Sequence, residues 1–241
     1  MAALSASEIL RLWELGLAQH PIDWALSLLA PAYPEATRDE LAALPIGQRN
    51  ALLLRLRAET FGTALAAISD CPKCDQRVEV NLETNDLQLP SVNDADSTLK
   101  VDAYEVDYRL PDSFDLAAAA GCRAVDDARA LLIERSIVEA RRDGRTIVAR
   151  ELPLEVLDRL GERISEHDPQ AEVVLELHCP DCDEAWKREL DVLTFLWEEI
   201  CISAKRLLRE IDALARAYAW SHQDILALSP ALRRSYLEMV T

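Results

Sequence analysis

Two Cys-Pro-x-Cys motifs constrain the fold of this chain more than any other feature of its sequence. A Cys-x-x-Cys turn brings two thiolates within reach of one metal ion, and two such turns supply the four sulfurs of a closed tetrahedral zinc site. Residues 75–178 separate the two motifs, but loop-closure entropy grows only slowly with length, so a shared site tolerates an insertion of this size. The predicted ligands of a structural zinc ion are Cys71, Cys74, Cys179 and Cys182.

Strand-like sequence flanks both motifs, which is how a zinc ribbon is built. Residues 77–83 alternate polar and apolar side chains, residues 171–178 lead into the second motif, and residues 185–190 follow it. Four thiolates leave no open coordination position, so the metal would be structural and not catalytic. Asp75 and Asp183 directly follow the motifs, where glycine would relax a left-handed backbone; aspartate tolerates that conformation better than most residues.

Other uses of the cysteines remain open at this point. A Cys-x-x-Cys pair can cycle between dithiol and disulfide, but the thioredoxin-like motif lies at the start of a helix, whereas strands follow both motifs here. His178 is adjacent to Cys179 and is an alternative metal ligand. Cys122 and Cys201 stand alone in helical segments, where we expect them to be buried as small hydrophobic residues.

The hydrophobic periodicity predicts an α+β fold that is mostly α. We expect a helical N-terminal region over residues 1–68, a split zinc ribbon over 69–84 and 170–190, an inserted α/β unit over 85–169, and a long C-terminal helix with a helical tail over 191–241. Within the insertion, residues 84–97 are expected to form a loop and residues 100–110 one or two short strands. The predicted helices of the second half of the chain cover residues 113–120, 126–141, 153–167 and 191–220. Capping boxes are expected at Ser5/Glu8, Thr37/Glu40 and Ser221/Asp224, and proline breaks follow His20 and Ser229.

The charge balance argues against several classes of partner. The chain has 26 Lys+Arg against 43 Asp+Glu, which gives a formal net charge of −17. Such a protein repels phosphate backbones and anionic lipid headgroups, so nucleic acid and membrane surfaces are poor candidates. The sequence contains no stretch of 18–20 apolar residues and no basic leader, so we expect a soluble, cytoplasmic protein. With six glycines, four histidines and no recognisable catalytic motif, we expect no enzymatic activity.

The five tryptophans lie in apolar patterns and are expected mainly to pack in the core. A sharper alternative is a docking surface near the junction of the long helix and the helical tail, because tryptophan is enriched at the energetic centres of interfaces. The candidate partner-contacting residues are Trp197, Trp220, Ile225, Leu226 and Tyr236.

Several short motifs occur along the chain: Leu12-Trp13-Glu14-x-Gly16-x-x-x-His20-Pro21-x-Asp23-x-Ala25-Leu26, Leu44-Pro45-x-Gly47-x-Arg49-Asn50, both cysteine motifs, Phe195-Leu196-Trp197, Arg206-Leu207-Leu208-x-Glu210 and Tyr218-Ala219-Trp220-Ser221-x-x-Asp224-Ile225-Leu226-x-Leu228. With these motifs the chain resembles the T4-like baseplate hub assembly chaperones of contractile-tailed phages and phage-derived contractile injection systems. This resemblance extends over nearly the whole chain, although many relatives have glycine where Asp75 and Asp183 stand here. It implies an assembly factor without catalytic residues that binds a hub or spike component in the bacterial host cell. The alternatives are a stoichiometric structural component of the baseplate and a thiol redox protein or redox-regulated holdase.

Overall fold

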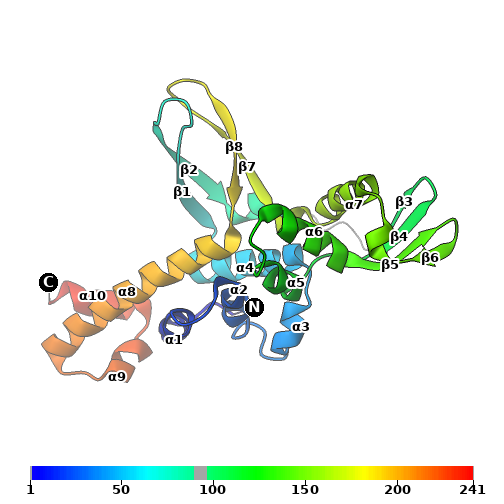
Figure 1. Cartoon of the computed structure of the whole chain (residues 1–241). Coiled ribbons are helices and arrows are strands. Elements are labelled where there is room, and N and C mark those ends of the chain that lie inside the picture. Colours follow the sequence, from blue (N-terminus) through cyan, green and yellow to red (C-terminus); the bar gives the residue numbers. More distant parts are fainter. Residues whose placement is uncertain (1, 90–96, 241) are drawn as a thin grey trace.

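The computed structural model describes residues 2–89 and 97–240 and shows a mixed α/β protein. N-terminal helices and the first half of a long C-terminal helix share the largest core. Two β-hairpins project side by side from this core, and a four-stranded sheet with its helices lies to one side of it (Figure 1). The far half of the long helix carries two short helices near the C-terminus (Figure 1).

The N-terminal region begins as four helices: α1 (Ala6–Gly16), α2 (Pro21–Leu29), α3 (Arg38–Ala42) and α4 (Ile46–Phe61). The predicted capping boxes at Ser5 and Thr37 are confirmed. Each hydroxyl accepts a hydrogen bond from the backbone N–H of the third helical residue, a glutamate, whose carboxylate accepts one from the backbone N–H of the cap residue. His20 caps α2 ahead of the proline at its first turn. These caps fix short helices whose apolar faces then complete the shared core.

Gly16 explains one of the sequence motifs by its packing. The rings of Trp24 and Trp197 are stacked with centroids 4.4 Å apart, and the indole Nε1–H of Trp24 donates to the carbonyl oxygen of Gly16 at 3.1 Å. A Cβ atom at position 16 would lie 1.9 Å from the Trp197 ring. Only glycine therefore allows α1 to approach the ring this closely.

The two hairpins are β1 (Ala64–Asp70) with β2 (Arg77–Glu83), and β7 (Val173–His178) with β8 (Ala185–Leu190). Both pairs are antiparallel. Strand β1 corrects the prediction of an entirely helical region over residues 1–68, because residues 64–68 pair with β2. A short 3-10 helix, η1 (Thr84–Leu87), occupies the start of the expected loop 84–97, and residues 90–96 of that loop lie outside the described residues.

The inserted unit contains an antiparallel sheet in the order β3-β4-β5-β6, formed by Thr98–Val101, Tyr104–Tyr108, Ile137–Arg142 and Arg145–Ile147. Helices α5 (Ser113–Ala119), α6 (Val125–Ser136) and α7 (Leu154–His167) accompany it, with short turns η3 (Ala149–Glu151) and η4 (Pro169–Ala171). The predicted helix over 126–141 is therefore wrong in its second part, since residues 137–142 pair with β4 as strand β5. A second core lies between this sheet and α7.

Asp115 of α5 ties the insertion together. Its carboxylate is fully buried and accepts hydrogen bonds from Arg109 at 2.6 and 2.9 Å and from Arg135 at 2.7 Å. Burial alone would raise the pKa of Asp115, but the hydrogen bonds from Arg109, from the Asp112 amide and from Arg135 lower it to about 2. This charge cluster joins the end of β4 to α5 and to the end of α6.

The predicted long C-terminal helix is α8 (Val192–Tyr218), followed by α9 (His222–Ala227) and α10 (Pro230–Glu238). Its first half packs in the largest core, and its second half forms a third cluster with α9 and α10. The predicted caps Ser221 and Ser229 are confirmed. Within residues 2–89 and 97–240, no helix combines the length and the apolar character that crossing a membrane requires.

Candidate metal centre

Each cysteine motif forms the tip of one hairpin, and the two tips have the same backbone geometry. In the first tip, the backbone N–H of Cys71 donates to the carbonyl oxygen of Gln76 at 2.9 Å, and that of Asp75 donates to the carbonyl oxygen of Cys71 at 3.0 Å. In the second tip, the equivalent hydrogen bonds run from the N–H of Cys179 to the carbonyl oxygen of Glu184 at 2.9 Å and from the N–H of Asp183 to that of Cys179 at 3.1 Å. Two hairpins of different sequence thus present the same turn.

The residue after each motif has the left-handed backbone that the sequence predicted. The φ angle is 56° at Asp75 and 59° at Asp183. Aspartate adopts this region at moderate cost, so the missing glycines do not prevent either turn from forming.

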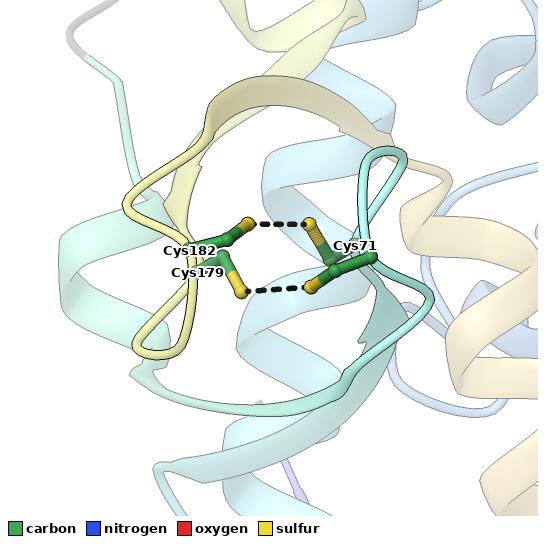
Figure 2. A group of neighbouring side chains, drawn as sticks. Cys71, Cys179 and Cys182 are labelled. Atoms are coloured by element: carbon green, nitrogen blue, oxygen red, sulfur yellow. Dashed lines mark hydrogen bonds between the residues drawn. The ribbon is translucent and has the colours of Figure 1, made fainter.

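The four thiols point toward one another across the gap between the hairpin tips (Figure 2). The sulfur atoms of Cys71 and Cys182 are 3.6 Å apart, as are those of Cys74 and Cys179, and all four lie within 4.8 Å of one another. Sulfurs bound at about 2.3 Å around a tetrahedral zinc ion lie about 3.8 Å apart, whereas a disulfide bond is about 2.05 Å long. The cluster therefore has the donor set and the spacing to hold one metal ion.

The site is half enclosed. Cys71 and Cys179 are buried at 1% and 2% exposure, Cys182 is half-buried and Cys74 is exposed. Lys73 on the first tip forms an ion pair with Glu184 on the second at 3.2 Å, and this hydrogen bond raises the pKa of Lys73. The ion pair joins the two tips independently of the thiols.

The thiols differ in how readily they lose a proton. Burial opposes ionisation of Cys71, but hydrogen bonds from the amides of Lys73 and Cys74 and from neighbouring thiols lower its pKa to about 7. The Gln76 amide favours the Cys74 thiolate, but hydrogen bonding to Cys182 and burial raise the Cys74 pKa to about 12. A divalent cation would offset the unfavourable ionisation of Cys74, because metal binding displaces the protons from all four thiols.

The other candidate ligand and the remaining cysteines lie outside the cluster. His178 is exposed, and its Nδ1 lies 3.7 Å from a carboxylate oxygen of Asp183. Cys122 and Cys201 are half-buried, in partial agreement with the expected burial. Within the described part of the chain, these four predicted cysteines are the group whose spacing could hold a metal ion.

The candidate partner residues fall into two groups. Trp197 and Ile225 are buried, with 8% and 0% of their surface exposed, so both pack in the core and do not form a partner surface. Trp220 and Tyr236 are half-buried and stand edge to face, with ring centroids 4.8 Å apart, and the half-buried Leu226 packs against the same third cluster. In this conformation the half-buried residues have surface left for a partner.

A buried polar junction joins α4 to the segment after α7. The sequence marks the residues of α4 but not those of the segment after α7. The Gly47 amide donates to the carboxylate of Asp168 at 2.8 Å, and Asn50 Nδ2 donates to the carbonyl oxygens of Gln170 and Ala171, both at 3.2 Å. Burial raises the pKa of Asp168. Gly47 and Asn50 belong to a motif that was singled out, whereas residues 168–171 carried no comparable signal beyond a proline.

The sequence matches one family model. That model is described as "T4 bacteriophage base plate protein", and it matches residues 22–196, which include both cysteine motifs, the inserted unit and the buried polar junction. No curated protein and no solved structure matches the chain significantly. Because the match covers most of the chain, this protein belongs to the T4 bacteriophage base plate protein family.

Proposed function

We propose that this chain is a non-enzymatic assembly chaperone for the baseplate hub of a phage tail or contractile injection system. The observation that carries the proposal is the family match over residues 22–196. The motifs shared with hub assembly chaperones support it further, because they continue past this range to Leu228. The chaperone would act in the cytoplasm of the bacterial host cell, where baseplates are built.

The proposed role of the four thiols is to hold a structural zinc ion in a split zinc ribbon. Sulfur spacings of 3.6 Å and the matching turns support this assignment. Zinc bound by four thiolates has no position left for water or substrate, so it stabilises the protein and does not catalyse. The ion would join the hairpins at their tips, at the ends of the strands opposite to those that enter the largest core.

The proposed client is a hub or spike protein of the baseplate. The net charge of −17 favours a client with a basic surface and keeps the complex soluble while apolar client surfaces are unassembled. A stoichiometric structural component of the baseplate is the second candidate, because the family description names the baseplate and not a chaperone. The redox alternative has less support, since strands both precede and follow each cysteine motif.

Co-production tests this function. The hub protein of the same apparatus is produced in a bacterial host alone, with this chain, or with an unrelated acidic protein of similar size and charge. We expect hub protein in the soluble fraction only with this chain, and we expect the two to co-purify. Hub protein that is equally soluble and equally competent for assembly in all three cultures would contradict the proposal.

A further inference from the structure

Helix α6 is unusual because it buries none of its apolar side chains completely. Of its residues Val125–Ser136, only Ser136 is buried. Its largest apolar side chains, Leu131, Leu132 and Ile133, are each half-buried, and Val125 at its start is 84% exposed. Helices in folded proteins depend for most of their stability on burying an apolar face. Helix α6 therefore presents an apolar surface that its own fold does not cover.

Hollows that share lining residues follow one another along this surface, beside α6 and α7. The three hollows have volumes of about 540, 370 and 470 Å³. Ile133 lines the first two, while Leu132 and Ile164 line the first and the third. Leu154, which is 79% exposed, stands at one end, and Val174 of β7 lies at the other. We call this feature the α6–α7 groove.

The rim of the groove is acidic. Besides the buried Asp168, six carboxylates from α6, α7 and the segment after α7 line the hollows, against the two guanidinium groups of Arg129 and Arg150. Arg129 is itself 3.9 Å from the carboxylate of Asp158. An occupant therefore gains from apolar side chains on its buried face and from lysine or arginine beside them. The six carboxylates are those of Asp126, Glu134, Asp158, Glu162, Glu166 and Glu172.

We propose that the α6–α7 groove is the docking site for an amphipathic segment of a baseplate client, with an apolar face flanked by basic residues. This inference rests on the proposed function and names the chemistry of the client. A second copy of this chain fits less well, because pairing two such faces would bring their acidic rims together in a chain of net charge −17.

Photo-crosslinking tests the site directly. A benzophenone amino acid replaces Ala130, which is exposed and lines the groove, in the full chain produced together with the whole apparatus. The control carries the same group at Ala117, exposed on α5 and outside all three hollows. We expect crosslinks from position 130 to one baseplate protein, at a peptide with apolar residues and nearby lysine or arginine. Crosslinking no stronger than at 117, crosslinks to this chain itself, or a peptide without basic residues would each overturn the proposal.

A substitution gives a quantitative second test with the client that the crosslink identifies. Ala130→Arg places bulk and positive charge in the groove with little loss of helix propensity, and Ala117→Arg is the matched control. We expect Ala130→Arg to weaken binding at least tenfold and Ala117→Arg less than twofold, with unchanged circular dichroism in both. Equal affinities in the two variants would overturn the proposal.

The outcome of these tests is separable from that of the proposed function. If the chain still keeps the hub soluble but position 130 gives no crosslink, the groove inference fails and the chaperone proposal stands. If the crosslink forms but the chain stays in finished particles in stoichiometric amount, the groove inference stands and the chaperone proposal fails.

Discussion

Replacing Cys179 with serine is the most informative single perturbation of the metal centre. The Cys179 sulfur is buried and 3.6 Å from that of Cys74. The variant keeps the size of the side chain but replaces a soft thiolate by a hydroxyl, which is a poor zinc ligand. Cys71→Ser makes the equivalent change on the other hairpin. Cys122→Ser is the matched control, since Cys122 lies outside the cluster.

The expected loss of stability depends on how much of the fold the ion would hold together. A four-thiolate zinc site contributes an apparent free energy on the order of 10 kcal/mol. Leu65 and Val173 anchor one strand of each hairpin in the largest core, so part of the fold remains without the ion. If only about 3 kcal/mol is lost, Tm still falls by about 6–12 °C in a chain of this size. We expect a drop of at least that size, together with lower soluble yield.

The assay is zinc per chain by native mass spectrometry together with thermal unfolding with and without a chelator. We expect one zinc per chain in the wild type and in Cys122→Ser, and substoichiometric zinc with a lower Tm in both cluster variants. Unchanged zinc content and unchanged Tm in both Cys71→Ser and Cys179→Ser would refute the shared site. A metal-free wild type that cycles two disulfides would support the redox alternative instead.

Three further predictions concern the turns and the buried charges. Gly47→Ala places a Cβ atom 1.7 Å from a carboxylate oxygen of Asp168, so we expect urea unfolding to show a loss of about 3 kcal/mol; a loss below about 1 kcal/mol would contradict the tight junction. The folded-state pKa of Asp115, about 2, lies below its ordinary value of 3.8, so its contribution of about 2 kcal/mol is complete above pH 4 and disappears as the pH falls through 2. Unfolding free energies measured from pH 5 to 2 should therefore fall more steeply in the wild type than in Asp115→Asn, and equal slopes would refute this assignment. Asp75→Gly and Asp183→Gly relieve left-handed backbone and should each stabilise the protein by about 0.5 kcal/mol in thermal unfolding; a loss of stability would show that the aspartate side chains contribute.

The four-cysteine cluster was predictable because the residue types and spacing that form it are local features of the sequence. Two Cys-Pro-x-Cys motifs identify four sulfurs, and the structure places them within 4.8 Å of one another. The capped helices were predictable for a similar reason, because Ser5, Thr37 and Ser221 satisfy helix amides within their own turns. In both cases the information is local to a few residues.

The errors occur where distant partners decide the local structure. Residues 64–70 are rich in alanine and resemble a helix, but pairing with β2 makes them strand β1. Residues 137–142 continue a helical pattern, yet the chain leaves α6 at Ser136 to pair with β4. The contact of Asp168 with Gly47 joins residues far apart in the sequence, and no motif marks the aspartate.

We propose that this chain assists baseplate assembly and then leaves the assembled particle. Quantitative mass spectrometry of purified, fully assembled particles tests it most directly, with assembly intermediates from the same cells as the reference. We expect this chain together with hub protein in the intermediates and less than one copy per finished particle. A fixed, stoichiometric number of copies in the finished particle would contradict it and identify the chain as a structural part of the baseplate.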